Sequence, residues 1–386
     1  MLNKKQQEAV LNQDRFVFLY AGAGTGKTTV MIEKIKYLMQ SGHQGSSILA
    51  LTFTKEATLQ MRERLNIEEV TIETFHAWVF NQLKGVSLIP EDAPFSNTML
   101  LKISQYKNQH QTSHLPISFY KYSKYLKQYP CIDYDDLLIK GINEKGFGKS
   151  YSFILIDEFQ DTNYLQLQLL LYLVKSETRV FAVGDPDQSI YKFRGAIPRI
   201  VEEFIHIFNA KTLYLRSNYR SYTYIIALAN HLIAYDRIRV KKKLIPSFDK
   251  KGLLQYKIFK DMDEEANFLY EYIKTLKNSI AILCRTHQRM FQIKNELFDR
   301  YLFLENNNIQ LLTMHQAKGL EFDHVIVVGL EQQTIPGRNS WDQESLNEER
   351  RLLFVAITRA KKSIIFTRVK SIGKPSQFLP ELNLKP

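Results

Sequence analysis

Eight residues near the start of the chain have the types and spacing of a phosphate-binding loop: Ala21, Gly22, Ala23, Gly24, Thr25, Gly26, Lys27 and Thr28. The apolar run 16–20 predicts a buried strand before the loop, and a helical pattern follows from Thr29 onward, which is the context that such a loop requires. Glycines let successive backbone N–H groups point at phosphate oxygens. Lys27 would reach the terminal phosphates and the Thr28 hydroxyl would bind Mg²⁺, although an ordinary glycine turn is the alternative.

A second candidate site lies far downstream, where the apolar run 153–156 is followed directly by Asp157 and Glu158. Carboxylates at the carboxyl end of a parallel strand lie where α/β sheets bind ligands. Asp157 can hold Mg²⁺ through water, and Glu158 is placed to take a proton from an attacking water. A solvated acidic turn is the alternative. Together with the phosphate loop, the acidic pair favours a site for ATP and Mg²⁺.

The hydrophobic pattern predicts the elements that position these residues. Apolar runs typical of strands alternate with segments of helical periodicity, which indicates an α/β fold with parallel sheets and crossover helices. The expected strands are 16–20, 47–53, 153–157, 179–184, 211–215, 279–284, 309–314 and 324–329. The expected helices include 55–65, 164–175, 198–208, 286–298 and 346–359.

The chain has 386 residues, enough for two or three packed units. Residues 85–130 are rich in Lys, Tyr, Gln and Ser and show no clear strand, so we expect a small, mostly helical insertion there. It would interrupt a first domain made of residues 1–84 and 131–210, and residues 211–386 would form a second domain. In the second domain, the run Lys241–Lys243 is typical of a solvated loop, although it could contact phosphates.

Composition restricts the class of protein. Hydrophobic residues make up 45% and charged residues 24% of the chain, which indicates a globular protein with a substantial core. The net charge of +12 and a pI near 9.3 favour a polyanionic partner, although basicity also suits anionic membrane surfaces. We find no secretory leader and no apolar run of membrane-spanning length. Cys131 and Cys284 are far apart, so we expect reduced core residues of a cytoplasmic protein.

Further motifs follow in a fixed order along the chain. They occupy residues 2–6, 51–57, 74–76, 183–196, 218–221, 313–322 and 348–360. With the phosphate loop and the acidic pair, they make the chain resemble superfamily 1 DNA helicases of the UvrD, Rep and PcrA type. The resemblance implies two RecA-like parallel-sheet motor domains of the P-loop NTPase class, which hold ATP between them.

At the nucleotide, the resemblance implies that Gln6 reads adenine, because its amide offers both a donor and an acceptor. Tyr219 would stack on the same base, and Glu321 is also implied at the nucleotide. Thr29 takes the position where many relatives have an arginine that packs on the other adenine face. One cation–π contact is therefore absent, and base selectivity is expected to loosen.

For catalysis, the resemblance implies that Gln188 senses the γ-phosphate and that Arg220 meets it. Arg359 would act as an arginine finger, a fixed guanidinium that stabilises charge on the transferring phosphoryl group. The expected catalytic residues are therefore Lys27, Glu158, Gln188, Arg220 and Arg359.

The resemblance also implies that single-stranded DNA is bound by small hydroxyls and N–H groups at phosphates and by aromatic rings at bases. Phe193 stands where many relatives have Trp, so its stacking on a base should be somewhat weaker. The implied DNA-binding residues are Thr54, Thr74, Phe75, His76, Tyr191, Phe193, Arg194, Thr313 and His315. Taken singly, the segments 51–57 and 74–76 could equally be strand-to-helix turns.

The implied activity is an ATP hydrolase that moves 3′ to 5′ along single-stranded DNA and separates strands at its junctions with duplex. Relatives usually carry a large accessory subdomain between the segments 281–297 and 313–322, whereas this chain has only a short stretch there. It therefore looks like a minimal two-motor core. The alternative is a motor or regulatory subunit that serves a partner such as a nuclease, in DNA repair or defence, and unwinds little alone. A basic nucleic-acid-binding protein with an inactive ATP site, and RNA as the substrate, are further alternatives.

Overall fold

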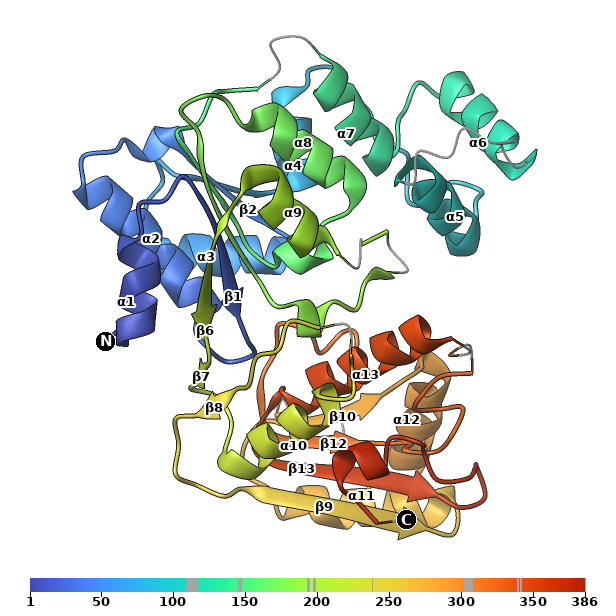
Figure 1. The fold of residues 1–386 in the computed structure, drawn as a ribbon. Coiled ribbons are helices and arrows are strands. Elements are labelled where there is room, and N and C mark those ends of the chain that lie inside the picture. Colours follow the sequence, from blue (N-terminus) through green and yellow to red (C-terminus); the bar gives the residue numbers. More distant parts are fainter. Residues whose placement is uncertain are drawn as a thin grey trace. The chain divides into compact units, whose positions relative to one another are not determined.

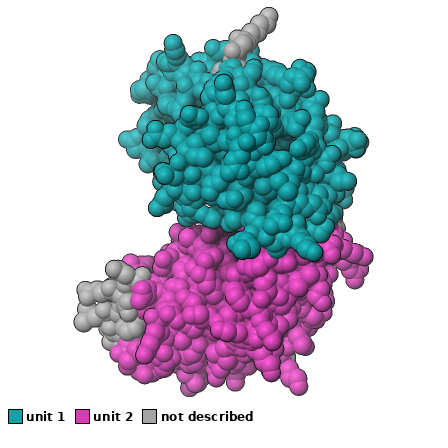
Figure 2. Space-filling view, turned by 90° about the vertical axis from the view of Figure 1, so that its left-hand side faces the viewer, with its two compact units in different colours: residues 1–21, 27–185, 191–215 teal, residues 22–26, 186–190, 216–386 magenta. Residues whose placement is uncertain are grey.

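The protein is described by a computed structural model over residues 1–108, 117–144, 148–192, 195–196, 199–237, 239–301, 308–338, 340 and 342–385 (Figure 1). It divides into two units (Figure 2). Unit 1 comprises residues 1–21, 27–185 and 191–215, and unit 2 comprises residues 22–26, 186–190 and 216–386. Two short segments that continue strands of unit 1 therefore belong to unit 2.

Unit 1 is built on a six-stranded parallel sheet with the order β3-β2-β4-β5-β1-β6. Its strands are β1 (Phe16–Ala21), β2 (Ile48–Thr52), β3 (Thr71–Thr74), β4 (Phe153–Ile156), β5 (Arg179–Gly184) and β6 (Lys211–Leu215). The central strands are nearly continuous apolar runs because helices cover both faces of a parallel sheet. Since β4, β5 and β1 are neighbours and parallel, the residues that follow them emerge at one edge of the sheet.

Among the described residues of unit 1, seven helices accompany the sheet, and a helical segment is inserted among them. The seven are α1 (Lys4–Leu11), α2 (Lys27–Gln40), α3 (Lys55–Leu65), α4 (Phe75–Gln82), α7 (Tyr134–Asn143), α8 (Tyr164–Leu173) and α9 (Ile200–Phe208). The inserted segment contains α5 (Asn97–Asn108) and α6 (Ile117–Gln128), which project to one side of the unit in Figure 1. Asp133 anchors both helices, because it accepts hydrogen bonds from Lys107 Nζ at 2.6 Å and from the Tyr122 hydroxyl at 2.7 Å.

Unit 2 is built on a five-stranded parallel sheet with the order β11-β10-β12-β13-β9. Its strands are β9 (Leu253–Phe259), β10 (Ile280–Cys284), β11 (Ile309–Thr313), β12 (Phe322–Val327) and β13 (Ala360–Val369). Its helices are α10 (Thr223–Ile233), α11 (Met262–Lys274), α12 (His287–Tyr301) and α13 (Gln343–Ile357). A small sheet pairs β7 (Ser217–Asn218) with β8 (Ile245–Pro246). Short 3₁₀ turns lie at Gly45–Ser47, Phe159–Asp161, Pro186–Gln188 and Pro380–Leu382.

The two parallel α/β sheets confirm the predicted fold class of two RecA-like domains with a helical insertion in the first. Each of the eight expected strands is present, with ends that differ by at most two residues. The two cysteines differ from each other: Cys284 is buried as expected, whereas Cys131 is only half-buried, and both are free thiols. Within the described ranges, no helix has the length and apolar character needed to cross a membrane.

Candidate nucleotide-binding and DNA-binding sites

The phosphate loop connects the end of β1 to the start of α2. Both the N–H and the hydroxyl of Thr25 donate to the Gly22 carbonyl, at 3.3 and 2.8 Å, which closes the loop into a tight turn. Gly24 and Gly26 have φ angles of +66° and +84°, a region that favours glycine. A Cβ at Gly24 would lie only 2.5 Å from the Asn218 amide nitrogen. The glycines at these positions are therefore required by backbone conformation and, at Gly24, by space.

Within unit 1, Lys27 and the acidic pair lie together at the carboxyl edge of the sheet. Lys27 Nζ lies 3.5 Å from Glu158 Oε1, and the buried Asp157 accepts a hydrogen bond from the Glu158 N–H at 2.9 Å. Glu158 has a φ of +49°, an uncommon conformation for a residue with a side chain. Such local strain is found at functional sites, where the surrounding structure maintains it.

Gln160 connects the turn after β4 to the turn after β5, a role that the sequence did not reveal. Its amide nitrogen donates to Glu158 Oε2 at 2.6 Å, and its carbonyl oxygen accepts from the Asp185 N–H at 2.8 Å. A Cβ at Gly184 would lie 2.7 Å from that oxygen, so the glycine there allows the close approach. Gln160 thus orients the proposed base, Glu158.

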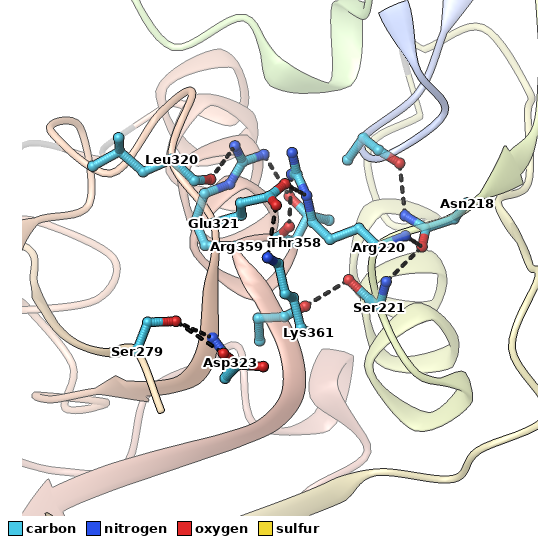
Figure 3. Close-up of polar contacts among 12 residues, drawn as sticks. Asn218, Arg220, Ser221, Ser279, Leu320, Glu321, Asp323, Thr358, Arg359 and Lys361 are labelled. Atoms are coloured by element: carbon cyan, nitrogen blue, oxygen red, sulfur yellow. Dashed lines mark hydrogen bonds and ion pairs between the residues drawn. The ribbon is translucent and has the colours of Figure 1, made fainter. Parts of the chain in front are cut away.

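In unit 2, Glu321 joins two cations (Figure 3). Arg220 Nε donates to Glu321 Oε2 at 2.8 Å, and Lys361 Nζ lies 2.7 Å from Glu321 Oε1. Partial burial alone would raise the pKa of Glu321, but the hydrogen bond from Lys361 and the charge of Arg220 together hold it below its ordinary value. Arg220 Nη1 also donates to the Thr358 carbonyl at 3.2 Å. The structure therefore brings Arg220 and Glu321, both predicted at the nucleotide, into direct contact.

Arg359 is buried and held by several acceptors of unit 2. Its Nε donates to the Val355 carbonyl at 3.0 Å and its Nη1 to the Leu320 carbonyl at 3.1 Å. Its Nη2 lies 3.2 Å from Gln188 Oε1, so the expected arginine finger and the expected γ-phosphate sensor are in contact. Figure 3 shows Arg359 beside the Arg220–Glu321 pair.

Asn218 is a buried residue of the site to which sequence reasoning gave no role. Its amide nitrogen donates to the Ala23 carbonyl of the phosphate loop at 2.7 Å. Its carbonyl oxygen accepts from the N–H groups of Arg220 and Ser221 at 3.0 and 2.8 Å. One side chain therefore fixes both the loop and the turn that carries Arg220. The available signal was an Asn followed by a polar turn before a helix, which is typical of an Asx turn.

The two residues expected near adenine, Gln6 and Thr29, have contacts of their own in unit 1. Asn3 and Gln6 form a reciprocal capping box at the start of α1, with hydrogen bonds of 2.8 and 2.9 Å. Thr29 lies in the first turn of α2, and its hydroxyl accepts a hydrogen bond from Arg64 Nη2 at 3.1 Å. Tyr219, in unit 2, is 44% exposed.

Two threonines expected at DNA phosphates cap helices in unit 1. The Thr54 hydroxyl accepts from the Ala57 N–H at 3.1 Å at the start of α3, and the Thr74 hydroxyl accepts from the Ala77 N–H at 3.2 Å at the start of α4. Both segments are therefore strand-to-helix turns, the local structure considered as the alternative. A helix start also presents backbone N–H groups that suit phosphates, so the two interpretations are compatible.

The aromatic and imidazole candidates of unit 1 differ in accessibility. Phe75 is buried, and His76 Nε2 is buried without a hydrogen-bond partner among the residues that the structure describes. Burial lowers the pKa of His76 to about 4, although the charge of Asp133 opposes the effect. Tyr191 is only partly buried and stacks on Phe53, with ring centroids 5.3 Å apart and planes inclined by 25°. Tyr191 is thus the more accessible ring.

The remaining DNA candidates fall into two groups. Phe193 and Arg194 lie outside the described residues. Thr313 ends β11, and its N–H and hydroxyl both donate to Gln316 Oε1 at 2.9 Å, with His315 in the same turn.

Comparisons with known proteins agree with this arrangement. Residues 6–194 match a family model described as an AAA domain, and residues 213–302 and 299–371 match one described as the UvrD-like helicase C-terminal domain. A protein of Mycoplasma pneumoniae named "Probable DNA helicase" is 31% identical, over 98% of this chain and 86% of that protein. "ATP-dependent DNA helicase Rep" of Buchnera aphidicola is 28% identical, over 78% of this chain and 53% of Rep.

A third similar protein is "ATP-dependent DNA helicase PcrA" of Leuconostoc citreum, which is 28% identical over 77% of this chain and 48% of PcrA. The chain thus matches most of the Mycoplasma protein but only about half the length of Rep and PcrA.

Proposed function

The chain belongs to the family of UvrD-like superfamily 1 helicases, and from this premise we propose that it is an ATP hydrolase that moves along single-stranded DNA. Movement would be 3′ to 5′ and would separate strands at junctions with duplex DNA. Residues 1–84 with 131–210 and residues 211–386 would be the two motor domains, and residues 85–130 an insertion. Binding and release of ATP would move their DNA-gripping surfaces alternately.

The observation that carries the proposal is the ion pair of Lys27 with Glu158, directly after the buried Asp157, at the carboxyl edge of the first sheet. On ATP binding, Lys27 would exchange the Glu158 carboxylate for oxygens of the β- and γ-phosphates. Glu158 would then be free to take a proton from the attacking water, with its orientation fixed by Gln160. The N–H groups of the loop residues 22–26 would bind phosphate oxygens.

Thr28 and Asp157 fit Mg²⁺, which takes hydroxyl and carboxylate oxygens and, at nucleotides, completes its shell with phosphate oxygens and water. The Thr28 hydroxyl lies at the first turn of α2, and Asp157 directly follows β4. When bound, Mg²⁺ would neutralise charge on the phosphate oxygens.

Three residues of unit 2 would act on the transferring phosphate. Arg220 and Arg359 would stabilise its charge, and Gln188, which contacts Arg359, would sense whether the γ-phosphate is present. Glu321 would hold Arg220 through their 2.8 Å ion pair. For DNA, the accessible ring of Tyr191 would support a base, and the helix starts after Thr54 and Thr74 would bind phosphates.

Steady-state ATP hydrolysis with and without single-stranded DNA tests the proposal. We expect DNA to stimulate hydrolysis strongly and the stimulated activity to be lost in Glu158→Gln and Lys27→Ala. Lys27→Ala should also weaken ATP binding, whereas Glu158→Gln should retain it, because Glu158 acts only on the water. Full activity in either variant would contradict the assignment of the ATP site.

A second candidate function is a motor that needs a partner, such as a nuclease, to unwind DNA. Its specific support is the short connection between helix α12, which ends at Tyr301, and strand β11, which begins at Ile309. The test is unwinding of a duplex with a 3′ single-stranded tail by the purified chain. Processive unwinding without any partner counts against this second function, and DNA-stimulated hydrolysis without unwinding favours it.

A further inference from the structure

Residues 186–190 form a short segment that changes unit. Strand β5 before it and Tyr191 after it belong to unit 1, whereas the segment itself belongs to unit 2. It carries Gln188, the expected γ-phosphate sensor, and its chain continues directly into Tyr191, an expected DNA contact. The residues that hold this segment in unit 2 therefore affect the positions of both an expected nucleotide contact, Gln188, and an expected DNA contact, Tyr191.

A buried charge cluster fixes the segment at Asp187. Arg239 donates two hydrogen bonds to the two Asp187 oxygens, at 2.9 and 2.7 Å, and Lys242 Nζ lies 2.5 Å from Asp187 Oδ2. The side chains of Asp187 and Lys242 are each only 3% exposed, and that of Arg239 is 11% exposed. Lys242 is thus not part of a solvated loop, and the expectation for the run Lys241–Lys243 is wrong at this residue. Its cation is instead placed against a buried carboxylate.

The next two residues of the segment are also held by cations of unit 2. Lys318 Nζ donates to the Gln188 carbonyl at 2.9 Å, and Arg351 Nε donates to the Ser189 carbonyl at 3.1 Å. Arg351 also binds Asp236 at 2.9 Å, which fixes its own position. With the bond from Arg359 to the Gln188 side chain, three consecutive residues receive hydrogen bonds from charged donors. Charge-assisted bonds are stronger than neutral ones, so the segment is held firmly.

Burying these charges costs desolvation free energy, and this cost limits how much the cluster can contribute to stability. Removing ions from water often offsets the whole attraction between them, so a buried ion pair is weak evidence of a contribution to stability. Buried ionic groups can instead specify one arrangement of the chain. Here the arrangement in question is the attachment of residues 186–190 to unit 2.

We propose that Asp187, held by Arg239 and Lys242, is a positioning residue that makes the Gln188 segment move with unit 2 and so couples the nucleotide state to Tyr191. This inference rests on the proposed motor function. When unit 2 responds to ATP, the anchored segment carries Gln188 with it and pulls on the chain at Tyr191. Without the anchor, ATP would still bind and be hydrolysed slowly, but DNA and nucleotide would no longer influence each other.

Two variants test the coupling. Asp187→Asn keeps the shape of the side chain but removes its charge, and Lys242→Met removes one cation while leaving the Asp187–Arg239 pair. In each variant we expect stimulation of ATP hydrolysis by single-stranded DNA to fall by about tenfold, within the usual range for coupling between two sites. ATP affinity should stay unchanged, and hydrolysis without DNA should fall far less than the DNA-stimulated rate. If Asp187→Asn fails to fold, DNA stimulation of ATP hydrolysis in Lys242→Met tests the inference.

Glu381→Gln is the matched control, because the Arg350–Glu381 pair is also largely buried in unit 2, and no hydrogen bond of this pair to residues 186–190 is found among the described residues. It should leave DNA stimulation unchanged. Stimulation retained within about twofold in both cluster variants, a change far smaller than known coupling energies, overturns the inference. So does an equal loss in the control, because the effect would then reflect general destabilisation.

Hydrogen–deuterium exchange keeps this inference separable from the proposed function. In the wild-type chain, residues 187–190 should exchange slowly, and Asp187→Asn should accelerate their exchange without affecting the strands of either sheet. If the wild-type chain shows no DNA stimulation at all, the proposed function fails. If it shows stimulation but Asp187→Asn leaves exchange and stimulation unaltered, only the present inference fails.

Discussion

At the scale of single residues, Arg359 shows how the chain can prepare a catalytic group in advance. Its guanidinium is oriented by the Val355 and Leu320 carbonyls, so two of its donors are fixed by backbone. A side chain held in this way loses little further entropy when it meets a developing charge, and it needs no reorganisation at the moment of reaction. The planar fork of arginine suits this arrangement, whereas the ammonium group of lysine is a single point charge.

We therefore predict that Arg359→Lys and Arg359→Ala both lower DNA-stimulated hydrolysis by ~10³-fold or more, the range known for arginine fingers. Lysine should not rescue activity, because it cannot donate to the two carbonyls and to a phosphate oxygen together. ATP affinity should change little, since the residue would act mainly in the transition state. Steady-state kinetics combined with binding of a fluorescent ATP analogue measures both. A Lys variant with near wild-type turnover would contradict the role.

Sequence reasoning located most reacting groups but not the groups that orient them. Lys27, Asp157 and Glu158 were predicted together, and the structure brings them to one edge of the sheet. Gln160 and Asn218 were missed, because their roles depend on which distant backbone groups they reach. The Asn218–Ala23 hydrogen bond spans 195 residues of sequence, and no local pattern encodes such a contact.

At the scale of elements, helix α1 joins local stability to a proposed binding role. Its capping box uses the Gln6 side chain, which is also the expected reader of adenine. The same Asn-x-x-Gln box, formed by Asn163 and Gln166, starts helix α8. The described residues therefore include this cap at both α1 and α8, and the cap of α1 contains a residue expected at the nucleotide, whereas that of α8 does not.

Asn3→Ala and Asn163→Ala make a matched pair. Each should lower the free energy of unfolding by about 1 kcal/mol, the usual cost of losing such a cap. Only Asn3→Ala should weaken ATP binding and reduce selectivity for adenine over guanine. The Asn3 side chain accepts from the Gln6 N–H, so its loss loosens the first turn of α1, which carries the Gln6 side chain. Urea denaturation and competition between ATP and GTP supply the two measurements. Equal effects of the two variants on ATP binding would contradict the proposed role of Gln6 in binding adenine.

The strands that sequence reasoning missed share a physical explanation. Strand β9 lies at the edge of its sheet and is half-exposed, so Gln255 and Lys257 interrupt its apolar pattern. Strand β13 begins with Ala360, Lys361 and Lys362, directly after helix α13 and with almost no turn between them. Strand β3 has only four residues. Periodicity therefore finds strands that are continuous apolar runs. It misses strands that are short or contain charged and polar residues, whether they lie at an edge, like β3 and β9, or inside a sheet, like β13.

At the scale of the whole molecule, one buried acid links the stability of unit 2 to pH. Glu331 follows β12 and is 0% exposed. Its Oε1 accepts from the Val369 N–H at 2.6 Å, and its Oε2 has no hydrogen-bond partner within the described part of the chain. Burial raises the pKa of Glu331 from the ordinary 4.5 to about 7, although the Val369 N–H and the charge of Arg289 oppose the rise. In the folded chain this carboxyl therefore keeps its proton across a range in which an exposed glutamate is ionised.

The sign of the pH effect follows from this difference. Below pH 4.5 both folded and unfolded chains are protonated at Glu331, and its contribution to stability is fully present. As the pH rises toward 7 only the unfolded chain loses the proton, so the contribution is lost, up to about 3 kcal/mol in total. Glu331→Gln cannot ionise, and its free energy of unfolding relative to wild type should rise between pH 5 and pH 8 in urea denaturation.

Glu321→Gln provides a comparison of opposite sign in the same unit. The pKa of Glu321 is lowered by Lys361 and Arg220 against the effect of burial, so its stabilising contribution is present above its ordinary pKa and is lost as the pH falls. Glu321 is also partly exposed, and its effect should therefore be the smaller of the two. If the two variants showed the same pH trend relative to wild type, general acid denaturation rather than the individual carboxyls would account for it. Opposite trends would assign the loss of stability between pH 4.5 and 7 to Glu331.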